Sequence, residues 1–225
     1  MKKSVIWGCL LSLCSFSNFA NEVLNNVPEH IEPTQRYVFY SHGYIVEGDN
    51  PKPVDTRFGW GEYDFPAIKD ALSDDTYTLI ATHRKKNTDP FEYAKHMSEQ
   101  IEYMVESGVS PSNIAIVGFS RGAFITGLVS NHLAKLGVNT VILAGCGRLI
   151  SPKHDDIRVY GHVLSIYEES DRAHTCDKLQ NKSPNAYSFT EIAIDTGLEH
   201  GAFYRPIPEW VTPLKDWLLV RFGDS

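Results

Sequence analysis

The chain has 225 residues, of which 28 are acidic and 21 are basic, so its net charge at neutral pH is −7. This length is enough for one sizeable hydrophobic core and short for two. An acidic chain with its charges scattered is poorly suited to nucleic acid or to an anionic membrane surface, so we expect neither as a partner.

Residues 1–20 have the features of a secretory signal peptide. Lys2 and Lys3 form a positively charged N-terminal region, an apolar stretch follows, and Ala20 is a small residue at which cleavage can occur. The apolar stretch is shorter than the ~20 residues that span a bilayer, so no stable membrane anchor is expected. We therefore predict a periplasmic or secreted protein. Cleavage would remove two basic residues and no acidic ones, which gives the mature chain a net charge of 19 − 28 = −9.

Residues 21–35 are polar and contain prolines, which predicts a loose lead-in to a single domain over 36–225. In that domain, short and nearly continuous apolar runs alternate with helical patterns. Such runs are typical of strands buried on both faces of a parallel sheet. The pattern predicts a three-layer α/β fold, an open and mostly parallel sheet of about six strands flanked by helices. The predicted strands are 37–43, 77–83, 113–119, 140–146, 161–170 and 186–195.

Three helices are expected between and after these strands. The first starts at a capping box with proline in the first helical position, and its apolar residues recur at helical spacing. The second is apolar over most of its circumference, which is typical of a central helix covered by its neighbours. The predicted helices run from Asp89 to Gly108, from Ser120 to Gly137, and from Thr212 through Val220.

The sequence Gly-Phe-Ser-Arg-Gly over 118–122 lies where a predicted strand meets a predicted helix. Ser120 could be a nucleophile raised out of the sheet by a sharp turn, for which Gly118 and Gly122 leave room. Alternatively, the two glycines only make a tight turn and Ser120 caps the helix that follows. The motif by itself is too frequent to decide between these interpretations.

Candidate partners for Ser120 follow other predicted strands. Ligands bind beyond the carboxyl ends of the strands in an open α/β sheet, and Asp171 and His200 follow the fifth and sixth strands. His200 would accept the proton of Ser120, and Asp171 would orient the imidazole. The backbone N–H groups of Tyr44 and Arg121 would stabilise the oxyanion. We predict Ser120, Asp171 and His200 as the catalytic residues.

Several alternatives remain open at this point. Glu168 and Glu169 adjoin Asp171 in the sequence, and Asp155 or Asp156 could supply the acid from an earlier loop. His42 is more readily explained as a structural brace of the oxyanion loop than as a second base. We expect no cofactor, and no metal either, because no two histidines have metal-ligand spacing on one helix.

These motifs resemble those of the α/β-hydrolase superfamily over most of the mature length. The stretch 118–122 matches its nucleophile motif, Ser-His-Gly-Tyr over 41–44 resembles its oxyanion loop, and 198–203 resembles the segment with its histidine. The resemblance implies a Ser–acid–His hydrolase that acts on an ester, thioester or amide. The lead-in is too short for the two leading strands of the full fold, and no cap domain fits. We therefore expect a minimal hydrolase with an open active site.

The loop over 44–65 is rich in aromatic residues, and with no cap domain it is the predicted wall of the substrate pocket. Phe58, Trp60 and Tyr63 are the predicted pocket residues, although such aromatics could simply pack beneath the loop. A basic turn over 83–86 follows the second strand on the same rim. It could favour an anionic substrate, but an exposed basic turn is the more frequent explanation.

Cys146 and Cys176 remain after signal cleavage, an even number in an exported chain. In the strand order that the resemblance supplies, the strands before them are neighbours, which implies a disulfide.

The sequence thus predicts an exported serine hydrolase, carboxylesterase-like, whose partner is a small ester. A thioesterase or a small-peptide hydrolase is the alternative within the enzyme class. A catalytically idle fold used as a binding module is the alternative outside that class. Nothing in the sequence indicates an oligomeric state.

Overall fold

The computed structural model describes residues 23–223, so the predicted signal peptide lies outside the described residues. The strands are β1 (Val23–Leu24), β2 (Tyr37–Ser41), β3 (Val54–Asp55), β4 (Gly61–Glu62), β5 (Thr78–Ile80), β6 (Ile114–Phe119), β7 (Asn139–Leu143), β8 (Gly161–Glu168) and β9 (Ala186–Ile194). Seven of them form one sheet in the order β1-β5-β2-β6-β7-β8-β9. All neighbours in this sheet are parallel, whereas β3 and β4 form a separate antiparallel pair.

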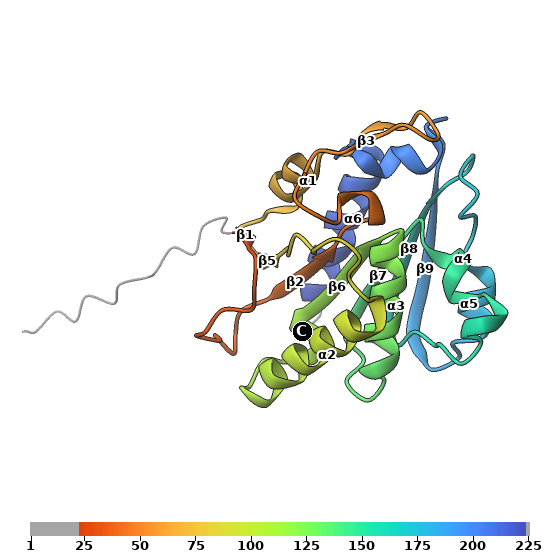
Figure 1. Ribbon diagram of the computed structural model, residues 1–225. Helices are drawn as coiled ribbons and strands as arrows, with labels where there is room; N and C mark the ends of the chain where they lie inside the picture. Colours follow the sequence, from red (N-terminus) through yellow and green to blue (C-terminus); the bar gives the residue numbers. More distant parts are fainter. Residues whose placement is uncertain (1–22, 224–225) are drawn as a thin grey trace, which may run out of the picture.

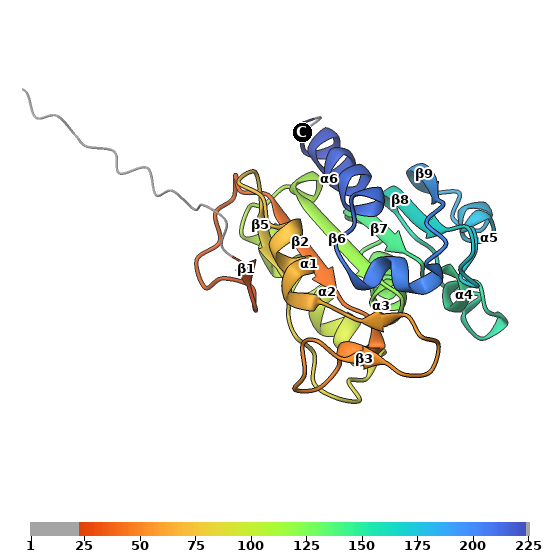
Figure 2. The same cartoon turned by 90° about the horizontal axis from the view of Figure 1, so that it is seen from above.

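Helices cover both faces of the large sheet, which produces three layers (Figure 1 and Figure 2). The α-helices are α1 (Phe65–Leu72), α2 (Pro90–Glu106), α3 (Arg121–His132), α4 (Cys146–Leu149), α5 (Asp177–Asn181) and α6 (Pro208–Gly223). Short 3-10 helices are η1 (Tyr44–Val46), η2 (Pro111–Asn113), η3 (Pro152–His154) and η4 (Glu199–Tyr204). Buried side chains of α1 and α6 share one core cluster with one face of the sheet, and those of α2 to α5 share a second cluster with the other face.

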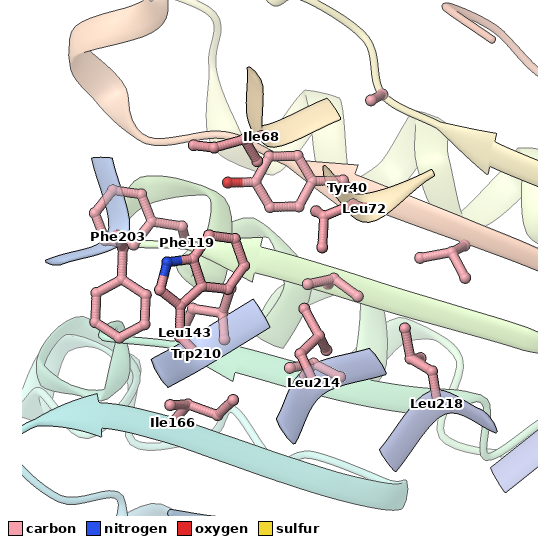
Figure 3. Packing of buried hydrophobic residues seen from close by; sticks show 14 of the residues in the cluster. Tyr40, Ile68, Leu72, Phe119, Leu143, Ile166, Phe203, Trp210, Leu214 and Leu218 are labelled. Carbon is pink, nitrogen blue, oxygen red and sulfur yellow. The ribbon is translucent and has the colours of Figure 1, made fainter. Parts of the chain in front are cut away.

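Strand β2 shows why the strands of the large sheet are nearly continuous apolar runs in the sequence. Val38 and Tyr40 join the cluster beneath α1 and α6, whereas Tyr37 and Phe39 join the opposite one. Successive side chains of a strand point to opposite faces, and here both faces are covered. Figure 3 shows the first cluster, in which Trp210, Leu214 and Leu218 of α6 lie against the strands.

The structure confirms the predicted three-layer α/β class. The six predicted strands correspond to β2 and β5 to β9. The additional strand, β1, has two residues and comes from the lead-in at the edge of the sheet. Because the strands are parallel, their carboxyl ends meet at one edge, and the segments that carry Ser120, Asp171 and His200 all begin there.

Two expectations about helices were incomplete. Helix α6 begins at Pro208 rather than at Thr212, and Pro213 lies inside it. Proline suits the first turn of a helix because that turn does not need its N–H. The buried Trp210 anchors the turn ahead of Pro213, since its indole N–H donates to the carbonyl of Arg205 at 2.9 Å. Helix α1 was not expected, although Asp64 caps it and Pro66 lies in its first turn.

Candidate active site

Ser120 lies on a sharp turn between β6 and α3. Its φ of 55° and ψ of −112° are an unfavourable backbone conformation for a residue other than glycine. A Cβ at Gly122 would overlap the carbonyl of Ser41, and one at Gly118 would overlap the hydroxyl of Thr126, so both positions require glycine. The Ser120 side chain makes no capping hydrogen bond to α3. The interpretation of Ser120 as a helix cap is therefore wrong.

His42 holds the loop that the sequence predicted to bind the oxyanion. It is fully buried, and its Nε2 accepts from the backbone N–H of Arg84 at 2.9 Å. Its Nδ1 therefore carries the proton and donates to the carbonyl of Gly43 at 2.8 Å. Because the carbonyl and the following N–H of a planar trans peptide point in opposite directions, this bond turns the N–H of Tyr44 away from His42. Burial, and then the charge of Arg84, lowers the pKa of His42 well below its ordinary value.

The N–H groups of Tyr44 and Arg121 are the first of η1 and α3, and first-turn N–H groups have no intrahelical acceptor. Among the described residues neither has a hydrogen-bond partner. Both residues border the space above Ser120.

Glu47 connects the two elements that carry these N–H groups. Its Oε1 lies 2.9 Å from Nε of Arg121 and 3.5 Å from Nε of Arg84. The side chains of Glu47 and Arg84 are almost completely buried, and Arg84 also donates to the carbonyl of His42. Arg84 is therefore an internal counter-ion, not part of the exposed basic rim that the sequence predicted over 83–86.

Asp171 and His200 are in contact. The Nδ1 of His200 donates to Oδ2 of Asp171 at 2.6 Å, and the acid is 4 % exposed. The other carboxylate oxygen accepts from the N–H of Ala173 at 3.1 Å. His200 lies in η4, and its ring centroid is 5.1 Å from that of Trp60 and 4.7 Å from that of Phe119. This geometry leaves Nε2 of His200 available to a group in the hollow that His200 lines together with Ser120.

The alternative acids have other surroundings. Glu168 is fully buried, and its carboxylate accepts hydrogen bonds from Ser170, Thr196 and Gly197 at 2.5 to 3.2 Å. Burial alone would raise the pKa of Glu168, but these hydrogen bonds outweigh it, so the pKa is lowered. Glu169, Asp155 and Asp156 are exposed. Among the described acids, Asp171 is the one that contacts the imidazole of His200.

Glu168 also connects two loops that sequence reasoning treated separately. Ser170 belongs to the segment of Asp171, whereas Thr196 and Gly197 lead to His200. A period-2 signal was present, because Glu168 falls on the same side of β8 as the buried Leu164 and Ile166. No comparable signal marks Glu47, which is one of five acidic residues in the loop over 44–65.

Two hollows meet above Ser120. The first, here called the aromatic hollow, has a volume of about 750 Å³, and its lining includes Phe58, Trp60, Phe119, His200 and Tyr204. The second, here called the arginine hollow, has a volume of about 600 Å³, and its lining includes Asn87, Thr88, Asp89, Arg121 and Arg148. Ser120, Tyr44 and Ala173 border both.

The aromatic loop contributes to the first hollow, but less than expected. Phe58 and Trp60 stack with ring centroids 4.4 Å apart, and the indole N–H of Trp60 donates to Glu199 at 3.0 Å. Tyr63 is fully buried, and its hydroxyl lies 3.0 Å from that of Tyr40. The prediction of Tyr63 as a pocket residue is therefore wrong, because its side chain packs beneath the loop. Burial raises the pKa of Tyr63 to about 12.

Cys146 begins α4, after β7, and Cys176 precedes α5. The structure joins them as a disulfide with a Cα separation of 5.4 Å. Since Cys176 lies five residues after Asp171, the link fastens the acid's loop to the neighbouring strand end.

Within residues 23–223, no group of three or more His, Cys, Asp or Glu side chains could hold a metal ion. A search of the same residues finds no helix with the length and apolarity to cross a membrane.

Comparisons identify similar structures but no similar sequences. No protein-family model matches the chain, and no curated protein matches it. A protein described as a YdeN-like hydrolase from Pectobacterium atrosepticum is 10% identical, with a TM-score of 0.56, over 83% of this chain and 92% of that one. Est1E from Butyrivibrio proteoclasticus is 12% identical, with a TM-score of 0.58, over 87% and 92%. An esterase/lipase from an uncultured bacterium is 13% identical, with a TM-score of 0.58, over 86% and 80%.

Proposed function

From the α/β-hydrolase fold of this chain and the groups around Ser120, we propose that the protein is a serine hydrolase that cleaves small carboxylic esters. The similar structures with hydrolase or esterase in their names support hydrolysis as the general chemistry. The observation that carries the serine mechanism is the 2.6 Å hydrogen bond from His200 to Asp171, beside a hollow that Ser120 also lines.

The first half of the reaction forms an acyl-enzyme. His200 accepts the proton of Ser120 at Nε2 while Oγ attacks the ester carbonyl, and Asp171 stabilises the imidazolium. The N–H groups of Tyr44 and Arg121 donate to the oxyanion. The intermediate then collapses, the bond between the carbonyl carbon and the alcohol oxygen breaks, and His200 delivers its proton to the departing alcohol.

Water completes the cycle by the same route. His200 removes a proton from a water molecule, which attacks the acyl carbon, and Ser120 leaves with the proton restored. The products are a carboxylic acid and a free enzyme.

We also propose that the protein is exported to the periplasm or secreted. The support is the signal-like composition of residues 1–20, together with the Cys146–Cys176 pair, since disulfides persist in oxidising compartments. Fractionation of cells that express the full chain, with N-terminal sequencing, tests this. Protein recovered in the cytosol with residues 1–20 attached would contradict it.

Covalent labelling tests the nucleophile. A fluorophosphonate probe should label the purified protein once, at Ser120, and Ser120→Ala should abolish labelling. The same substitution should lower kcat for an ester by about 10⁴- to 10⁶-fold, the range known for triad serines. Ser110→Ala is a suitable control, because that serine is exposed and lies near the amino end of β6, at the opposite edge of the sheet from Ser120. Labelling that persists in Ser120→Ala would reject the assignment. An absence of labelling in the wild type would favour a catalytically idle fold.

A further inference from the structure

His200 gives the two hollows different roles in ester hydrolysis. It lines the aromatic hollow but not the arginine hollow. In the proposed reaction, His200 delivers its proton to the alcohol oxygen, so the alcohol must depart on the side of His200. The acyl group is bonded to the same carbonyl carbon and extends the other way. This assigns the alcohol to the aromatic hollow and the acyl chain to the arginine hollow.

Arg148 is the distinctive charge of the arginine hollow. Its guanidinium carbon lies 4.6 Å from the ring centroid of Phe124, so the group is held against α3 by a cation–π contact. No described carboxylate lies within ion-pair distance of Arg148. Arg148 is exposed and lines the arginine hollow, so its positive charge faces this space without a described acid to neutralise it.

The other charges of this hollow are already engaged. Arg121 pairs with Glu47 at 2.9 Å and donates to the carbonyl of Thr88 at 2.6 Å. Asp89 accepts from the N–H groups at the start of α2 at 2.8 and 3.0 Å. Arg148 is therefore the positive charge of this hollow that has no described acidic partner and can bind an anionic group of a substrate.

We infer that the acyl group of the substrate ends in a carboxylate that Arg148 binds, so that the substrate class is the monoesters of dicarboxylic acids. This inference rests on the proposed function and adds the substrate class. A planar guanidinium can bind a carboxylate through two parallel hydrogen bonds, which favours arginine over lysine for this task. The aromatic lining of the first hollow suits an aryl or other apolar alcohol.

Matched esters test the substrate class. The probes are the mono(4-nitrophenyl) esters of succinic to suberic acid, each compared with the same compound methylated at its free carboxylate. Rates are corrected for spontaneous hydrolysis, which is fast for the shortest acids. At least one free acid should have a kcat/KM about fivefold above that of its methyl ester, the upper range for an exposed ion pair. This ratio should shrink as the salt concentration rises to 0.5 M, since salt screens the attraction.

Substitutions then test whether Arg148 causes the preference for free acids over methyl esters. Arg148→Met should bring the ratio of the two kcat/KM values close to one, and Arg148→Glu should bring it below one. Lys135→Met removes a positive charge beyond the far end of α3 and should leave the ratio unchanged. Lys86→Met removes a positive charge that lines only the aromatic hollow, so it should also leave the ratio unchanged.

The outcomes separate this inference from the proposed function. Equal hydrolysis of free acids and methyl esters by the wild type would overturn the inference and leave the serine hydrolase in place. A preference that survives in Arg148→Met, or that disappears in Lys86→Met, would overturn the role of Arg148. Failure to hydrolyse any of the esters, with no fluorophosphonate labelling, would overturn both proposals.

Discussion

Two buried glutamates hold the two halves of the candidate site, and they do so by different physical means. Glu47 lies on the side of the proposed oxyanion donors Tyr44 and Arg121, here called the oxyanion side, where its partners are the charged side chains of Arg84 and Arg121. Glu168 lies on the side of the acid and the histidine, where its partners are backbone N–H groups and hydroxyls of two loops.

The two glutamates differ in the charge of their partners. Glu47 compensates buried positive charge, because burial lowers the pKa of Arg84 and Glu47 is among the groups that counter this effect. Glu168 carries a buried negative charge that neutral dipoles satisfy. The acid side also has a covalent fastening, the disulfide next to the segment of Asp171, whereas the oxyanion side is held by ion pairs and by His42. Four predictions test this comparison.

The largest effect is expected from breaking the acid–histidine contact itself. Asp171→Asn should lower kcat by up to about 10⁴-fold with the fold intact, because an amide favours the wrong histidine tautomer. Steady-state ester hydrolysis measures the loss, and Glu169→Gln, an exposed neighbour, should have little effect. A mild Asp171→Asn together with a damaging change at Glu168 or Glu169 would show that another acid serves His200.

The second prediction compares the two glutamates directly. Glu47→Gln leaves the buried Arg84 without a counter-ion and should lower the free energy of unfolding by about 3–5 kcal/mol. Glu168→Gln keeps one acceptor oxygen but points an amide at hydrogen-bond donors, which should cost about 1–3 kcal/mol. Urea unfolding measures both. Equal costs would mean that compensation of the buried arginine charge is not what distinguishes the two sides.

The third prediction concerns removal of the disulfide. Without the closed loop, whose ends are 30 residues apart, the free energy of unfolding should fall by about 3–4 kcal/mol. Reduction should slow fluorophosphonate labelling at urea concentrations too low to unfold the sheet, since the loop of Asp171 is released first. Alkylation of the denatured, unreduced protein followed by mass measurement is the control. In protein that lacks residues 1–20, and with them Cys9 and Cys14, two modified cysteines would show that the bond is absent.

The smallest effect concerns His42 on the oxyanion side. Its pKa is lowered in the folded protein, so below the ordinary value of 6.5 the unfolded chain binds a proton that the folded chain does not. The free energy of unfolding should therefore fall as the pH falls, by about 1.4 kcal/mol from this residue between pH 7.5 and 5.5.

His42→Gln can replace both hydrogen bonds and should remove this contribution to the pH dependence of urea unfolding. His96→Gln, at an exposed histidine, should leave it unchanged. An identical pH dependence in wild type and His42→Gln would mean that His42 is not the titrating group.

The sequence predicted the parts of the molecule that depend on local rules. Side-chain alternation in buried strands, helix caps and the glycines around Ser120 act within a few residues, so the α/β class and six of the strands could be recognised. The prediction at Thr212 failed, because the burial of Trp210 extends α6 by one turn ahead of Pro213. That burial depends on packing against the sheet and not on the local sequence.

The candidate site also has some features that the sequence determines and others that only the tertiary structure determines. The order of Ser120, Asp171 and His200 along the chain is a property of the sequence, and parallel strands bring their ends to one edge. Which acid meets His200, the burial of Tyr63, and the pairing of Glu47 with Arg84, 37 residues away, were decided by the tertiary structure. Such contacts depend on the mutual packing of loops that are distant in the chain, and no periodicity or motif in the sequence encodes that packing.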